Sequence, residues 1–124
     1  MSDAPNEATL TVRSAEMLGP VLSRVVGMLA ARAQCPIDRL DEAMLLTDAV
    51  AAHSPAHGVA GAVTITIAAD ERALELRVGA PGAGGPAALL AAAELPGVGN
   101  VFERVADYAQ PVDGHLVLRL SFAS

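Results

Sequence analysis

Residues 76–85, LRVGAPGAGG, have the glycine spacing of a nucleotide-binding loop. An apolar strand is expected to lead into Gly82 and Gly84, whose backbones have the freedom that a tight turn around a phosphate requires. Ala80 stands where such a loop needs a carboxylate, and its methyl group offers no hydrogen bond. The segment therefore suggests a scaffold for a phosphate ligand that lacks a side chain needed to hold the rest of that ligand.

A second glycine cluster, PGVGNVFERVADY, covers residues 96–108. Gly97, Gly99 and Asn100 precede an expected helix, and backbone N–H groups at a helix start can bind an anion. A helix start with two glycines is also common where no ligand binds. A residual phosphate site and a ligand-free turn therefore both stay open here.

Asp48 and Ala52 are spaced i, i+4 on an expected helix, which places both on one face. Asp48 offers a carboxylate to that face, either for chemistry or merely to solvent, whereas Ala52 has no oxygen to coordinate a cation. His53 and His57 have the same spacing, but a Ser-Pro pair between them breaks the helix that would align them. No third ligand is near in sequence, so we expect no metal site.

The composition limits the classes of protein to which this chain can belong. The 124 residues fit one domain, and the hydrophobic fraction of 52% argues against disorder. All eight cations are scattered Arg residues and the net charge is −6, so we expect no nucleic-acid partner. An acidic surface suits a basic protein partner, and it equally suits plain solubility.

We expect a cytoplasmic protein that makes no membrane contact. The chain has no run of about 18 apolar residues, and its N-terminus, MSDAPNEAT, is acidic and polar rather than signal-like. The lone Cys35 rules out an internal disulfide, which is consistent with a reducing compartment.

The hydrophobic pattern predicts an α+β fold. We expect strands at residues 8–12, 62–69, 73–78 and 114–122, and helices at 14–33, 38–53 and 99–108, with a short helix at 86–94. Residues 1–7 are expected to form a disordered tail, and residues 8–124 a single domain. This order is most simply a two-layer sandwich, in which helices cover one face of a mixed, mostly antiparallel sheet.

Each long helix carries an apolar stripe that should face the sheet. Ser14 is the expected N-cap of the first helix and Asp38 that of the second. The first stripe comprises Leu18, Val21, Leu22, Val25, Met28 and Leu29, and the second Leu40, Ala43, Met44, Thr47, Val50 and Ala51. In the helix at 99–108, Val101, Val105 and either Tyr108 or Ala109 should point inward.

In the order and spacing of these segments, the chain resembles the histidine-kinase-like (GHKL) ATPase fold, in its branch of small bacterial anti-sigma factors and serine-protein kinases. The resemblance covers nearly the whole chain, from ATLTV at residues 8–12 to the last strand. It implies that Asp48 occupies the position of the family's catalytic Glu, and that Ala52 replaces the Asn that holds Mg²⁺. It also implies that Ala80 replaces the Asp that accepts the adenine amino group.

The same resemblance implies a vestigial nucleotide and phosphate loop formed by Gly82, Gly84, Gly97, Gly99 and Asn100. Because metal and adenine ligands are missing, we expect no bound cofactor, with ATP and Mg²⁺ bound only if the site still functions. The implied function is regulation by protein–protein binding in bacterial transcription signalling. The implied partner is a sigma factor or an anti-sigma antagonist, and a homodimer is plausible.

Two alternatives stay open. The chain could be an active ATP-dependent serine kinase that phosphorylates an anti-anti-sigma partner, which requires a metal and a positioned base. It could also be an α+β domain of unrelated function, whose similarity to the family is architectural only.

Overall fold

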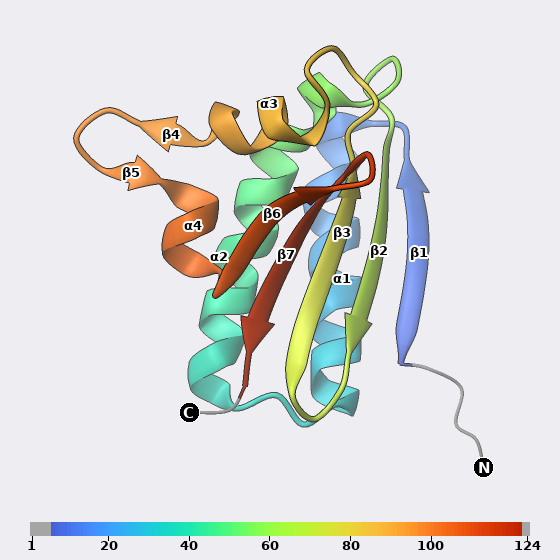
Figure 1. The fold of residues 1–124 in the computed structure, drawn as a ribbon. Helices are drawn as coiled ribbons and strands as arrows, with labels where there is room; N and C mark the ends of the chain where they lie inside the picture. Colours follow the sequence, from blue (N-terminus) through green and yellow to red (C-terminus); the bar gives the residue numbers. More distant parts are fainter. Residues whose placement is uncertain (1–5, 123–124) are drawn as a thin grey trace.

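The computed structural model describes residues 6–122, which form an α+β sandwich of two layers (Figure 1). Its strands are β1 (Glu7–Val12), β2 (Val63–Ala69), β3 (Ala73–Gly79), β4 (Glu94–Leu95), β5 (Gly99–Asn100), β6 (Tyr108–Val112) and β7 (His115–Ser121). Its helices are α1 (Ala15–Arg32), α2 (Ile37–His53), α3 (Gly85–Ala92), α4 (Val101–Val105) and the 3₁₀ helix η1 (Ser54–His57). The predicted fold class is confirmed.

The main sheet has five strands in the order β1-β2-β3-β7-β6, and each neighbouring pair is antiparallel. The helices α1 and α2 lie behind this sheet in Figure 1, and within residues 6–122 no helix covers its other face. The alternation along β2 explains this difference, because Val63, Ile65 and Ile67 are buried while Thr64 and Thr66 point to the uncovered face. We call the uncovered side the open face.

The helix α1 is rotated relative to the predicted stripe. Leu18, Leu22 and Leu29 are buried as predicted, but Met28 is 52% exposed and Val26 takes its place in the core. In this orientation Gly19 faces α2, because a Cβ on Gly19 would lie 3.8 Å from Ala51 Cβ. Ser14 does occupy the N-cap position, although its side chain makes no capping hydrogen bond.

The helix α2 begins one residue before the predicted cap. Pro36 is its N-cap residue, and Asp38 lies in the first turn, where a carboxylate interacts favourably with the helix dipole. The helix ends at His53, as predicted, and Ala43, Thr47 and Val50 of the expected stripe are buried. Leu46 and Ala49 are also buried, and the pattern alone did not indicate them.

The last third of the chain departs from prediction. The expected helix at 99–108 is only the short α4, and Tyr108 begins β6, a strand that the sequence analysis missed. Pairing with β7 satisfies the backbone of β6, and the Asp107 carboxylate accepts a hydrogen bond of 2.7 Å from Ser121 N. The predicted short helix is confirmed as α3.

The predicted tail was too long. Asn6 Nδ2 donates hydrogen bonds to the carbonyls of Leu29 (2.8 Å) and Ala69 (3.0 Å), and β1 begins at Glu7. Residues 1–5 of that predicted tail lie outside the described residues, as do residues 123 and 124. Within the described chain, no helix combines the length and apolarity needed to cross a bilayer.

Candidate functional site

Asp48 and Ala52 share the outward face of α2, as their spacing predicted. Both are exposed, together with Leu45, whereas Thr47 and Val50 on the opposite face are buried. Asp48 makes no hydrogen bond or ion pair with another residue in the range 6–122. In this arrangement the carboxylate of Asp48 is solvated, and the methyl group of Ala52 beside it offers no ligand atom.

Ala80 lies in the hydrophobic core, where it is only 1% exposed. Its amide donates a hydrogen bond of 3.1 Å to the Gly114 carbonyl, which ties the end of β3 to the β6–β7 hairpin. Burial at this position would oppose the charged form of a carboxylate. The position that the family resemblance assigns to an adenine-binding Asp is therefore occupied by close aliphatic packing.

Gly82 and Gly84 are needed for packing between η1 and α3. A Cβ on Gly82 would lie 3.3 Å from the His57 carbonyl oxygen, to which the Gly82 amide donates a hydrogen bond of 3.2 Å. Gly84 is the N-cap of α3 with φ of 84°, and a Cβ there would lie 2.8 Å from Ala88 Cβ. These contacts account for both glycines without a ligand.

The second glycine loop forms the tip and the end of the β4–β5 hairpin. The Val98 amide donates a hydrogen bond of 3.0 Å to the Leu95 carbonyl, and Pro96 is followed by Gly97 with φ of 76°. Proline followed by a residue with positive φ is typical of a type II turn. The turn therefore explains Gly97 by itself, and Gly99 with φ of 104° begins β5.

Asn100 is a buried structural cap, with 7% of its surface exposed. Its Oδ1 accepts a hydrogen bond of 3.2 Å from Glu103 N, and its Nδ2 donates one of 2.7 Å to the Leu90 carbonyl. Because both polar atoms of the side chain bind the protein, Asn100 joins the start of α4 to the end of α3. The side chain of Asn100 therefore caps the first turn of α4 from within the protein.

The candidate residues are brought together only in part. The rings of Phe102 on α4 and His53 on α2 meet edge to face with centroids 6.0 Å apart. This contact places the start of α4 beside the C-terminal end of α2, which carries Asp48 and Ala52. Ala80 points into the core instead, so it contributes no group to this region.

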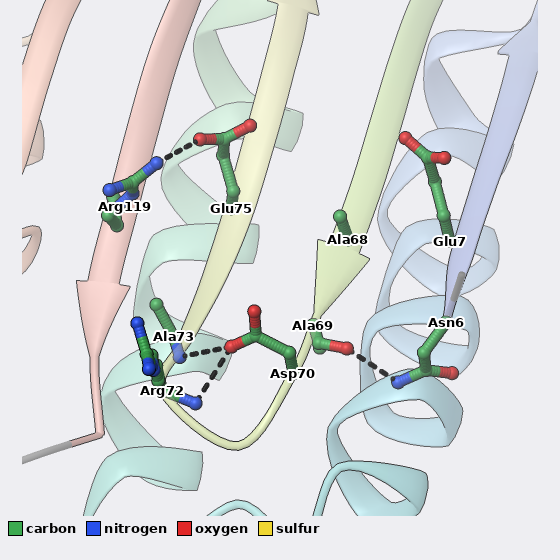
Figure 2. Close-up of a pocket in the computed structure, with 9 residues that line it drawn as sticks. All are labelled: Asn6, Glu7, Ala68, Ala69, Asp70, Arg72, Ala73, Glu75 and Arg119. Carbon is green, nitrogen blue, oxygen red and sulfur yellow. Dashed lines mark hydrogen bonds and ion pairs between the residues drawn. The ribbon is translucent and has the colours of Figure 1, made fainter. Parts of the chain in front are cut away.

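The open face has a hollow at its lower end in Figure 1, near the β2–β3 turn (Figure 2). This lower hollow has a volume of about 550 Å³, and its charged lining residues are Glu7, Asp70, Arg72, Glu75 and Arg119. Arg119 donates a hydrogen bond of 2.8 Å to Glu75, which raises the pKa of Arg119. The Asp70 carboxylate accepts hydrogen bonds from the amides of Arg72 (2.7 Å) and Ala73 (3.0 Å). Charges of both signs therefore meet within this hollow.

A second hollow lies at the other end of the open face, where β1 and β3 end and β7 begins. This upper hollow has a volume of about 530 Å³. Its polar side chains are those of Thr11, Arg13, Thr64 and His115, and no Asp or Glu lines it. The remaining lining is provided by Val59, Ala60, Ala62, Gly79, Ala80, Pro81 and Gly114.

One side of α1 exposes apolar side chains. Met17 is 53% exposed, Met28 is 52% exposed and Val21 is half-buried. Helical periodicity puts these three residues opposite Gly19, which faces α2. The helix α1 packs against the covered face of the sheet at β1 and β2. The side of α1 that points away from α2 is therefore the side nearer to the edge strand β1. We call Met17, Val21, Met28 and the free edge of β1 the α1 flank.

Sequence analysis found the glycine loops but missed both hollows and the α1 flank. The alternation of charged and apolar residues along β3 indicated a solvent-facing row, without showing what would lie opposite it. Among residues 6–122, no three His, Cys, Asp or Glu side chains gather closely enough to hold a metal ion. No family model matches the chain, and no curated protein is significantly similar to it.

Proposed function

We propose that this chain is a cytoplasmic regulatory domain of the anti-sigma-factor type, which acts by binding a protein rather than by chemistry on a nucleotide. The observation that carries the proposal is the α1 flank. Met17 and Met28 are half-exposed on the side of α1 nearer to β1, and β1 is an edge strand of the sheet. Contiguous apolar surface of this kind is characteristic of protein interaction sites, and flexible Met side chains adapt well to a partner.

The surroundings of the nucleotide-motif positions support the first part of the proposal. Ala80 is packed in the core and Ala52 has no ligand atom. Asn100 uses both polar atoms of its side chain inside the protein. A phosphoryl-transfer site needs a held metal ion and a positioned base, and these residues supply neither.

The proposed partner is a sigma factor or an anti-sigma antagonist, and a second copy of the chain also fits the α1 flank. Of the two edges of the sheet, β6 includes Pro111, which has no N–H to donate to an added strand. The strand β1 has no proline, and its residues Ala8, Leu10 and Val12 are only partly buried. The β1 edge is therefore the one better suited to strand addition by a partner.

The test is a pair of matched variants. Met17→Asp combined with Met28→Asp places two charges on the α1 flank, whereas Leu45→Asp places one on the outward face of α2, where Leu45 is 56% exposed. We expect the double variant to weaken binding to the cognate sigma factor or antagonist by roughly tenfold or more, because each buried Met contributes about 1.5–3 kcal/mol. Binding by the control should be unchanged, and sedimentation of the same variants tests the homodimer.

Equal binding by the double variant and the native chain would contradict the proposal. A separate measurement addresses the nucleotide. Thermal unfolding with and without millimolar Mg·ATP should give the same melting temperature, because binding at 100 times Kd would stabilise the fold by about 2.7 kcal/mol and raise the temperature by several degrees. Such a rise would favour the active kinase instead.

A further inference from the structure

The upper hollow differs from its surroundings in charge. The chain carries a net charge of −6, yet the only ionisable side chains in the lining of the upper hollow are those of Arg13 and His115. The Arg13 guanidinium has no hydrogen bond or ion pair with another residue in the described chain. An arginine without a partner beside an apolar wall is an unmatched positive group, and carboxylates are the groups that it binds best.

Two further polar groups, a threonine pair and His115, line the upper hollow. The hydroxyls of Thr11 and Thr64 lie 2.8 Å apart, and only one of their two protons is used between them. The other proton is available to a ligand. His115 Nδ1 lies 3.0 Å from the Asp113 carbonyl, which can only accept, so Nδ1 carries a proton. The Nε2 atom of His115 then has no hydrogen-bond partner in the described chain.

The rest of the lining is apolar and is formed by separate segments of the chain. Val59 and Ala62 come from the loop before β2, and Pro81 comes from the loop after β3. The volume of about 530 Å³ lies within the range of small-molecule pockets, which are mostly apolar with a few polar groups that fix orientation. A ligand matched to this lining has one anionic end and a compact apolar body.

We propose that the upper hollow is a binding site for a small organic carboxylate. The carboxylate group is bound by Arg13 together with the Thr11–Thr64 hydroxyl pair, and the apolar body of the ligand packs against Val59, Ala62 and Pro81. This inference does not depend on the proposed protein partner, because it is argued only from the lining of the upper hollow, although β1 contributes both Thr11 to this lining and its free edge to the α1 flank.

The experiment is a titration of the isotope-labelled full chain with benzoate, followed by amide chemical shifts. Benzamide, which has nearly the same shape without the charge, is the matched ligand. We expect saturable shifts centred on Thr11, Thr64 and Gly79, and a Kd for benzamide that is roughly tenfold to hundredfold weaker than that for benzoate, since a charge-assisted hydrogen bond is lost. Equal affinities, or shifts centred on the lower hollow, would overturn the proposal.

Variants separate the proposed site from general attraction between an anion and arginine. Arg13→Gln should weaken benzoate binding by roughly tenfold or more, whereas Arg24→Gln, with the same change in charge on α1, should leave it unchanged. Val59→Glu tests the wall by adding a carboxylate beside the ligand, and we expect loss of binding without loss of the fold. Retention of native affinity by both Arg13→Gln and Val59→Glu would refute the site.

Discussion

Ala52 and Ala80 occupy the two positions where the family resemblance requires nucleotide ligands, but their surroundings are opposite. Ala52 is exposed on the outward face of α2, where a larger polar side chain would extend into water. Ala80 is 1% exposed and belongs to the core under the end of β3. A polar side chain at the first position would be solvated, whereas one at the second position would start from a buried backbone.

From this difference we predict that introducing the motif residues that the resemblance assigns to these two positions would not create a nucleotide site. A residue on a helix surface can change with little effect on folding, because solvent satisfies any polar group that it carries. A residue in a close-packed core cannot, because its neighbours are arranged around its volume and polarity. Four substitutions test this interpretation, from the largest expected effect to the smallest.

Ala80→Asp should have the largest effect. A carboxylate at this position, where Ala80 is 1% exposed, loses most of its hydration and should lower the free energy of unfolding by about 3 kcal/mol or more. Urea denaturation of the variant measures the loss, with Ala80→Ser as a smaller polar control. A loss below about 1 kcal/mol, within the range of ordinary surface changes, would show that the core at this position can admit a carboxylate and would break the comparison.

Asn100→Ala should rank second. The substitution removes the cap of α4 and leaves the Leu90 carbonyl without its donor, so we expect a loss of about 1–3 kcal/mol in unfolding free energy. Asn100→Asp is a second variant for denaturation, because it keeps the oxygen that accepts from Glu103 N and replaces the donor to the Leu90 carbonyl with a charged oxygen. If both variants were as stable as the native protein, Asn100 would have no structural role, and a ligand role would again be open.

Gly84→Ala should destabilise the fold by about 1–2 kcal/mol, because alanine is strained at φ of 84°. The new Cβ would also approach Ala88 Cβ to 2.8 Å. Gly97→Ala separates these causes, since Gly97 has φ of 76° but nothing within 4 Å of a built Cβ. The difference in unfolding midpoint between the two variants measures the packing contribution. A smaller loss at Gly84 than at Gly97 would contradict the close approach.

Ala52→Asn should change stability least, by less than about 0.5 kcal/mol. It supplies the amide oxygen that the resemblance assigns to a Mg²⁺ ligand, yet we expect no rise in melting temperature with Mg·ATP, because the adenine side of the site is closed at Ala80. A nucleotide-dependent rise in this variant would show that the loss of one helix residue was the main defect.

The local pattern of hydrophobic and polar residues predicted most of the fold. The alternation along β2 and β3 and the 3.6-residue period of α1 and α2 are properties of neighbouring residues, so they could be recognised without tertiary information. The strand β6 could not, because it contains a proline and is stabilised by pairing with β7. The orientation of Met28 likewise depends on where α2 contacts α1, which no local pattern specifies.

Some features of the candidate site could likewise be predicted from the sequence, and others could not. The sequence by itself determined that Ala52 and Ala80 lack ligand atoms, that Asp48 shares a face with Ala52, and that glycines occur in two loops, because these are matters of residue type and spacing. Only the tertiary structure decided that Ala80 is in the core, that Asn100 is a cap, and that Arg13 meets His115 around an apolar hollow. These outcomes depend on contacts between residues distant in the chain, and such contacts are set by packing the whole domain rather than by any local segment.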